Sequence, residues 1–224
     1  MSKRMTELVK LIDRTKSYSV EEAIKLAKAT SKTKFDANIE LHAKLGIDTK
    51  KGDQQVRTTL TYPKTFGKTR VIAAFVSTEN EKKAKDAGAD IVGGEELIKK
   101  IIQTKKVDFD IAIATPDMMK VLAPAARILG PRGLMPSPKN NTVTPNIAGV
   151  ISEFKKGKIE FKNDSGGNVH LVMGKVSFED KDLIENFYAA MDVIKKAKPS
   201  SSKGTYIKNV SVSSGMGPGI KVQF

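Results

Sequence analysis

The chain contains no cysteine, and its histidines are His42 and His170. The missing cysteines exclude disulfides, thiolate metal sites and cysteine nucleophiles. Because two imidazoles are too few for an ordinary zinc site, we expect no metal and no other cofactor. The sequence also has no run of about 18 apolar residues, and its first ten residues lack an apolar signal core. We therefore expect a cytoplasmic protein that does not insert into a membrane.

Acidic residues are too few to balance the basic ones. The 224 residues include 39 Lys and Arg but 25 Asp and Glu, which gives a net charge of +14 and an isoelectric point near 9.7. Such an excess favours a polyanionic partner, usually a nucleic acid held partly through its phosphates. The alternative is a general solubilising charge. A membrane surface would also attract cations, but we find no basic amphipathic helix with bulky apolar anchors.

The first third of the chain predicts a helix followed by antiparallel strands. Ser19 and Glu22 have the spacing of a capping box at the start of the stretch VEEAIKLAKAT. Between residues 35 and 47 the odd positions are all apolar, whereas the even positions are mostly polar. This alternation predicts a long, half-buried antiparallel strand. After a KKGD turn, residues 54–62 predict a partner strand for it.

From residue 70 the pattern changes to short apolar strands that alternate with helices. Strands are predicted at 70–76, 90–94 and 108–116, and helices at 79–89, 95–106 and 117–130. Alternation at this spacing is typical of a small parallel sheet with flanking helices. Pro124 lies inside the last helix and should kink it.

Antiparallel features return after residue 157. Residues 157–164 and 168–176 predict a hairpin around an SGG turn. Ser177 is predicted to cap the following helix, and Pro199 to end it. Two final strands then flank the glycine-rich turn GMGPG.

These patterns predict two domains, one inserted in the other. Residues 1–66 plus 158–224 should form an α+β domain, and residues 67–157 an inserted α/β domain. Because the chain crosses twice between them, we expect a hinge with relative motion of the domains.

An α/β domain raises the question of a nucleotide enzyme. A dinucleotide site needs a glycine-rich turn after the first strand, but the turn VSTENEKK has no glycine and carries Glu79 and Glu81. The stretch GPRGLMPSPK lacks the Lys-Ser/Thr ending of a P-loop. His42 lies on the polar side of its strand, which suits a solvated or RNA-facing imidazole, and Asp108 and Asp110 are typical of strand edges. We find no credible active site.

The stretches KFDANIELHAKLGID, KKGDQQVRTTLTYP, ATPDMMKVLAPAARILGPRGLMPSPKNNTVT and NVSVSSGMGPGIKV follow one another in this order. Together they resemble the large-subunit ribosomal protein one family, the bacterial L-one stalk proteins. The resemblance covers essentially the whole chain, and several long motifs in order make it specific. GPRGLMPSPK is similar to the signature of that family.

The resemblance implies a terminal RNA-binding domain and a Rossmann-like middle domain. It implies a non-enzymatic, monomeric component of the large ribosomal subunit that binds a stem-loop of ribosomal RNA in the mobile stalk. It further implies contact with exit-site tRNA and, as in many bacteria, repression of translation from its own operon mRNA. The alternative, a nucleotide- or RNA-processing enzyme with a Rossmann-like domain, conflicts with the missing glycine fingerprint.

The resemblance also implies which residues contact RNA. Carried over by position, they are Lys34, Phe35, Asn38, Glu40, Asp164, Gly166, Gly167, His170, Asn209, Ser211, Ser213, Met216 and Gly217.

Elementary chemistry agrees with part of this set. Lys34 can meet a phosphate, and Gly217 has no side chain to obstruct a sugar-phosphate backbone. Phe35 can stack on an unpaired base or a sugar, although its place in the apolar register by itself predicts a core residue. Met216 has a flexible thioether, which suits an irregular RNA surface better than a core.

Two positions depart from the family pattern. The family usually has threonine where this chain has Gly215, so a hydroxyl that could bond RNA is missing, with an expected loss of about 1 kcal/mol in binding. Ser213 or Ser214 could compensate for it. Asn209 stands where some members have serine.

The loop 128–144 is neither a cradle for a small phosphate nor catalytic. We expect it to face the hinge, where Arg132 and Lys139 can touch RNA or the other domain, while its prolines stiffen the connection. The alternative is a purely structural loop.

Overall fold

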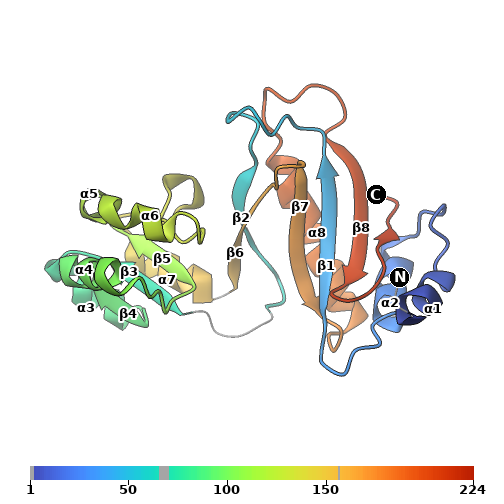
Figure 1. Ribbon diagram of the computed structural model, residues 1–224, viewed down its shortest axis with the longest axis horizontal. Coiled ribbons are helices and arrows are strands. Elements are labelled where there is room, and N and C mark those ends of the chain that lie inside the picture. Colours follow the sequence, from blue (N-terminus) through green and yellow to red (C-terminus); the bar gives the residue numbers. More distant parts are fainter. Residues whose placement is uncertain (1–2, 66–70, 156) are drawn as a thin grey trace. The chain divides into compact units, whose positions relative to one another are not determined.

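The computed structural model describes residues 3–65, 71–155 and 157–224 (Figure 1). It divides into two compact units, Met1–Gly67 with Glu160–Phe224, and Lys68–Ile159. The predicted boundary between residues 66 and 67 lies outside the described residues. Each unit is mixed α/β, and each is considered by itself below.

The first unit is built on a four-stranded antiparallel sheet in the order β7-β1-β8-β9. Its strands are β1 (Asn38–Leu45), β7 (Asn168–Lys175), β8 (Ile207–Ser214) and β9 (Ile220–Lys221). The central strand β1 pairs with β7 on one side and with β8 on the other, so that His42 lies opposite both His170 and Ser211. Strand β1 thus occupies the middle of the sheet, and the alternation along it reflects one buried side and one polar side.

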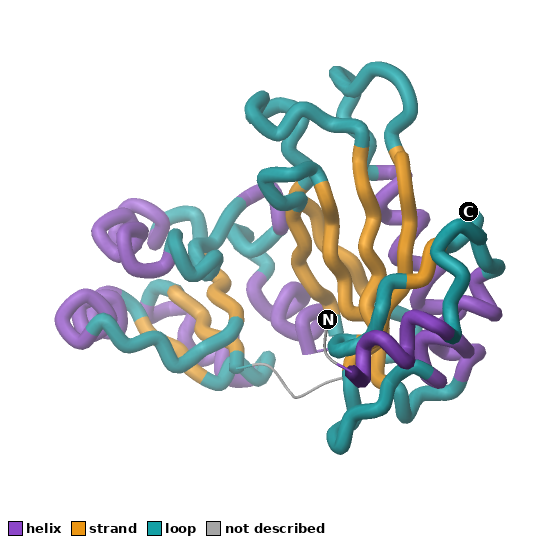
Figure 2. The backbone as a smooth tube through the Cα atoms, turned by 45° about the vertical axis from the view of Figure 1, so that its right-hand side comes forward, coloured by secondary structure: helices purple, strands orange, loops and turns teal. Residues whose placement is uncertain are grey.

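Helices cover one face of this sheet. Helix α2 (Val20–Ala29) and helix α8 (Asp180–Lys196) contact each other and the strands, and Figures 1 and 2 show α8 behind β7 and β1. The predicted capping box is confirmed, because the Ser19 hydroxyl accepts from the Glu22 amide and the Glu22 carboxylate accepts from the Ser19 amide. A further helix, α1 (Lys3–Lys10), has no counterpart among the predicted elements. The buried residues of the sheet and the two helices include Ile24, Ala27, Ile39, Leu41, Ala43, Leu171, Met173, Leu183, Phe187, Val210 and Val212.

Two predicted strand pairings are wrong. Strands β2 (Arg57–Thr61) and β6 (Lys158–Lys162) pair with each other in a separate two-stranded sheet, so β2 does not pair with β1 and β6 forms no hairpin with β7. Asn163 explains the second error, because its amide donates to the Val56 carbonyl (3.0 Å) and its Oδ1 accepts from the Val56 amide (2.7 Å). These bonds hold the end of β6 against the β2 segment before the chain turns towards β7.

The predicted cap at Ser177 is also wrong. Helix α8 begins at Asp180 after the N-cap residue Glu179. Ser177 instead bonds Asp36, whose carboxylate accepts from the Ser177 hydroxyl (2.8 Å) and from the Ser177 amide (3.1 Å). A serine that meets a carboxylate from another segment is not available to cap a helix.

The second unit is a parallel sheet in the order β4-β3-β5, formed by β3 (Ile72–Phe75), β4 (Ile91–Gly93) and β5 (Ile111–Ala114). The predicted parallel pairing is therefore confirmed. Every residue of β3 and β5 is buried, because helices pack on both faces of the sheet. The helices of this unit are α3 (Glu81–Asp86), α4 (Glu95–Thr104), α5 (Met118–Leu122), α6 (Ala126–Leu129) and α7 (Ile147–Lys155).

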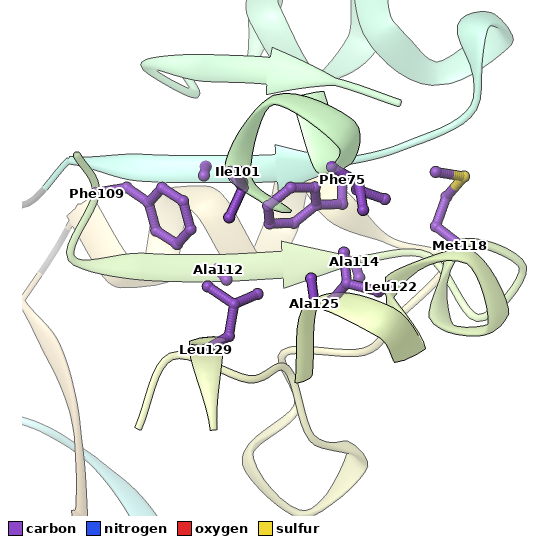
Figure 3. Packing of buried hydrophobic residues seen from close by; sticks show 11 residues of the cluster. Phe75, Ile101, Phe109, Ala112, Ala114, Met118, Leu122, Ala125 and Leu129 are labelled. Atoms are coloured by element: carbon purple, nitrogen blue, oxygen red, sulfur yellow. The ribbon is translucent and has the colours of Figure 1, made fainter. Parts of the chain in front are cut away.

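Alternate residues of the strands enter two separate cores. Phe75, Ala112 and Ala114 pack with residues of α4, α5 and α6, including Leu122 and Leu129 (Figure 3). Ile72, Ala74 and Ile113 pack on the other face, with residues of α3 and α7. The predicted helix 117–130 is broken by the 3-10 segment Ala123–Ala125, which contains Pro124. This is the expected effect of a proline inside a helix.

Candidate nucleic-acid interface

The face of the four-stranded sheet opposite α2 and α8 carries polar side chains, and we call it the open face. Side chains alternate along a strand, so residues that pair directly across strands share a face. The register therefore assigns one set of residues to this face, all polar except Val172: Asn38, Glu40, His42, Lys44, Asn168, His170, Val172, Lys175, Asn209, Ser211, Ser213 and Lys221. All are exposed or half-buried except Ser213, which is 8% exposed. The open face is thus a mainly polar, accessible surface that spans all four strands.

Six of the residues implied by the family resemblance lie on this face, and they come from three strands. They are Asn38, Glu40, His170, Asn209, Ser211 and Ser213. Segments more than 160 residues apart in the chain are therefore brought together here.

The other implied residues lie at the two ends of the open face. Phe35 precedes β1 and Met216 follows β8, and these segments meet because the Gly215 amide donates to the Asn38 carbonyl (2.9 Å). The turn that contains Asp164 and Gly167 lies at the opposite end of β1, where Lys44 pairs with Asn168. An eight-residue strand such as β1 is roughly 25 Å long. The implied residues therefore form a strip along the sheet, with a loop cluster at each end.

Phe35 is 59% exposed, so its assignment to the core from the apolar register is wrong. Strand β1 starts at Asn38, and the chain bends at Lys34 and Phe35, so the alternation does not extend to them. Lys34 is exposed beside Phe35, and Met216 is 54% exposed. This end of the face therefore presents an aromatic ring, a thioether and an ammonium group to solvent.

The turn before β7 is held by the carboxylate of Asp164. Its Oδ1 accepts from the Asn168 amide (2.7 Å), and its Oδ2 accepts from Asn168 Nδ2 (2.9 Å). The side-chain bond from Asn168, followed by the backbone bond, lowers the pKa of Asp164 to about 2. Gly167 has a φ of +76°, which disfavours any residue with a side chain. Asp164 and Gly167 therefore shape the turn, and His170 lies within reach of Asp164 at 3.5 Å.

The open face mixes charges of both signs. Lys44 Nζ donates to the Gly166 carbonyl, and Lys221 lies across from Ser211. Glu40 lies on the same strand as Lys44, beyond His42, with its Oε2 3.8 Å from His42 Nε2. A carboxylate repels phosphates but accepts hydrogen bonds from base amino groups and ribose hydroxyls. The face is therefore suited to reading the shape and hydrogen-bonding groups of a folded RNA, in addition to phosphate contact.

His42 is a residue of this face that is absent from the implied set. Its Nδ1 lies 2.8 Å from His170 Nδ1, and its Nε2 lies 3.0 Å from Ser213 Oγ. The polar position of His42 in its strand indicated that its side chain faces away from the core. Its two hydrogen-bond partners could not be predicted in the same way, because they lie on β7 and β8, the strands on either side of β1.

The loop 128–144 belongs structurally to the second unit. Leu134 and Met135 pack against the core shown in Figure 3. The Ala114 amide donates to the Thr142 carbonyl (2.9 Å), and Ala114 forms a parallel bridge with Val143 at the end of β5. These contacts favour the structural alternative for the main part of the loop.

Arg132 in this loop donates from Nη2 to the carbonyl of Lys105 (3.3 Å), the residue that ends helix α4. A cation at this position also complements the helix dipole. Lys139 lies in the 3-10 turn Pro138–Asn140, and its side chain is outside the described part of the structure. The predicted contact of Arg132 and Lys139 with RNA or the other domain therefore stays a prediction.

In residues 3–65, 71–155 and 157–224, no group of three or more His, Cys, Asp or Glu side chains could hold a metal ion. Within the same ranges, the helices are too short or too polar to cross a bilayer.

Comparison with known proteins identifies relatives along the whole chain. The model of the "Ribosomal protein L1p/L10e family" matches residues 27–218. "Large ribosomal subunit protein uL1" of Mesoplasma florum is 50% identical over 223 residues, which cover 100% of this chain and 98% of the relative. The proteins of the same name from Thermosipho melanesiensis and Thermosipho africanus are each 49% identical over 221 residues, covering 99% of this chain and 95% of the relative. All three are named as ribosomal proteins and none as an enzyme.

Proposed function

Since the chain belongs to the ribosomal protein L1p/L10e family, as a protein of the large ribosomal subunit and not an enzyme, we propose that the open face of its four-stranded sheet binds a folded stem-loop of ribosomal RNA. The supporting observation is that six implied RNA contacts from three strands lie on one accessible face, with Phe35 and Met216 at one end and the Asp164 turn at the other.

The chemistry of this face suits RNA better than it suits a generic polyanion. Exposed Phe35 can stack on an unpaired base, and the amide of Asn38 can read a base edge. The carboxylate of Glu40 can accept a hydrogen bond from a ribose 2′-hydroxyl, a group that DNA lacks. The net charge of +14 adds an attraction that does not depend on sequence.

The test is binding of the full chain to the stalk stem-loop of its ribosomal RNA and to a scrambled hairpin, each across a salt series. Lys44→Glu changes a lysine on the open face, and Lys25→Glu makes the same change on α2, on the opposite side of the sheet. We expect Lys44→Glu to weaken binding more, and to lower the salt slope by about 0.7 to 0.9 for each phosphate that the protein no longer neutralises. Equal binding of both RNAs, or equal effects of both substitutions, would contradict the proposal.

The family resemblance supports further parts of this proposal. The two compact units act as domains joined by a hinge near residues 66–67 and 157–158, and the protein works on cytoplasmic ribosomes in the mobile stalk, where it contacts exit-site tRNA. The same open face also binds an element of the protein's own operon mRNA that resembles the ribosomal site, and so represses its translation. A reporter fused to that mRNA leader tests the last point, because Lys44→Glu should relieve repression and Lys25→Glu should not.

A further inference from the structure

Two histidines meet at the centre of the open face, where β1 lies between β7 and β8. His42 Nδ1 and His170 Nδ1 are 2.8 Å apart, and the rings meet edge to face with centroids 5.0 Å apart. The other nitrogen of His42 lies 3.0 Å from Ser213 Oγ, and the other nitrogen of His170 lies 3.5 Å from Asp164 Oδ2. The four side chains therefore form a continuous chain from β8 across β1 to the turn before β7.

The residues at the two ends of this hydrogen-bond chain determine which atom donates each bond. Asp164 is an anion that only accepts hydrogen bonds, so His170 Nε2 carries the proton that faces it. A neutral His170 then has a bare Nδ1, and His42 must donate to it from Nδ1. The bare Nε2 of His42 in turn accepts from the Ser213 hydroxyl. Glu40 favours a proton on His42 Nε2, but its oxygen is at 3.8 Å, farther than Asp164 is from His170.

We propose that His42 is a positioning residue of the RNA surface, which acts through His170 and Ser213 and presents their hydrogen-bonding groups to RNA in a proton-dependent way. This inference rests on the proposed function, because it assumes that the open face is the surface that meets RNA. His42 has 27% of its side chain exposed and His170 has 56%, so His170 is the more accessible partner and His42 supports it from within the sheet.

One added proton reverses the direction of the hydrogen bond between His42 and Ser213. When His42 becomes an imidazolium, its Nδ1 still donates to His170 and its Nε2 now donates to Ser213. The Ser213 hydroxyl is then free to donate outward, and the face gains a positive charge. A second proton on His170 would place two N–H groups against each other, so the pair takes up one proton before the contact breaks.

The surroundings favour a neutral His42 in the absence of RNA. Burial lowers the pKa of His42, the neighbouring His170 lowers it further, and Glu40 opposes both effects. The charged groups on the face around the pair are Glu40 and Lys44 on β1, Asp164 before β7, Lys175 on β7 and Lys221 on β9, while β8 contributes Asn209, Ser211 and Ser213. An RNA phosphate above this face would stabilise the protonated form of His42, so we expect RNA binding to be coupled to the uptake of a proton as the pH is lowered.

The first test reads the imidazole nitrogens of the full chain by NMR. The sequence has two histidines, so one substitution, His170→Asn, assigns both sets of signals. Above pH 7.5 we expect His42 as the Nδ1–H tautomer and His170 as the Nε2–H tautomer. Observation of the Nε2–H tautomer at both rings would overturn the proposal. This measurement needs no RNA and no altered His42, so it remains decisive if a substitution at His42 prevents folding.

The second test is a double-mutant cycle on stem-loop binding with His42→Phe and Ser213→Ala. We expect His42→Phe to weaken binding about tenfold, which is the scale of one to two hydrogen bonds. The double variant should bind no more weakly than His42→Phe, because Ser213 depends on His42 for its orientation, and the gain in affinity at low pH should shrink. Additive losses with an unchanged pH profile would overturn the proposal. If the wild-type chain does not prefer the stem-loop to a scrambled hairpin, the proposed function is wrong. The NMR measurement of the tautomers then still shows whether the hydrogen bonds among Asp164, His170, His42 and Ser213 run in the proposed direction.

Discussion

A β-carbon built on Gly217 would overlap the hydroxyl oxygen of Ser214. The two residues belong to the turn that leaves β8, where the Gly217 amide donates to the Ser214 carbonyl (2.8 Å). Ser214 is 2% exposed, and its side chain has little room to move away. Glycine at position 217 is therefore required by the protein itself, in addition to any need for close approach of an RNA backbone.

We expect Gly217→Ala to lower the free energy of unfolding by about 1–3 kcal/mol, as overpacking does. Adding Ser214→Ala should restore most of this loss, because it removes the oxygen that the new methyl group meets. Urea denaturation measures both effects. Gly219→Ala is the matched control, since a β-carbon there has no atom within 4 Å. If Gly217→Ala unfolds normally but abolishes RNA binding with and without Ser214→Ala, the glycine serves RNA approach alone.

Gly215→Thr should tighten RNA binding roughly fivefold, the equivalent of about 1 kcal/mol for one hydrogen bond. A β-carbon at Gly215 would have its nearest neighbours at ordinary contact distances, Glu40 Oε1 at 3.7 Å and the Asn38 carbonyl at 3.8 Å. The substitution therefore fits without strain and places a hydroxyl at the edge of the open face. Filter-binding or anisotropy titration measures the affinity. Gly215→Val has the same shape without the hydroxyl, and an equal gain from valine would show that the hydroxyl is not the cause.

Phe35→Ala should separate binding from stability. Because the ring is 59% exposed, we expect the free energy of unfolding to change by less than about 0.5 kcal/mol. Loss of a base-stacking ring should weaken RNA binding by about 1–3 kcal/mol. Tyr188→Ala removes an aromatic ring that is 50% exposed on α8, away from the open face, and should leave RNA binding unchanged. A large stability loss with Phe35→Ala, or intact binding, would exclude the stacking role.

The lowered pKa of Asp164 predicts that the protein loses stability at low pH through the turn before β7. Its folded pKa of about 2 lies below that of an unfolded aspartate, so its ionised form stabilises the folded state. This contribution is complete above about pH 5 and is lost as the pH falls towards 2. Asp164→Asn should therefore reduce stability at pH 7 and flatten the pH dependence between pH 4.5 and 2. Thermal unfolding across this range measures it, with Asp108→Asn as a surface control, and a wild-type slope in Asp164→Asn would disprove the assignment.

Local patterns in the sequence determined many elements of this protein. The capping box at Ser19, the alternation along β1, the βαβ order of the second unit and the break at Pro124 each depend on residues close together in the chain. Such patterns act through helix and strand periodicity or through one proline ring, so they can be predicted without the tertiary structure. The motifs that carry the family resemblance also named most of the residues on the open face and at its two ends.

Only the tertiary structure decided which segments meet. An alternating strand shows which side is buried but does not identify its neighbour. The pattern therefore could not show that β2 pairs with β6 instead of β1. Asn186 shows the same limit, because it lies fully buried on the apolar side of α8. Its Nδ2 donates to the carbonyls of Lys64 (2.9 Å) and Met173 (2.8 Å), and its Oδ1 accepts from the Lys64 amide (3.2 Å). The contact between His42 and His170 likewise requires the register of two strands that are 128 positions apart at these residues, which no local periodicity contains.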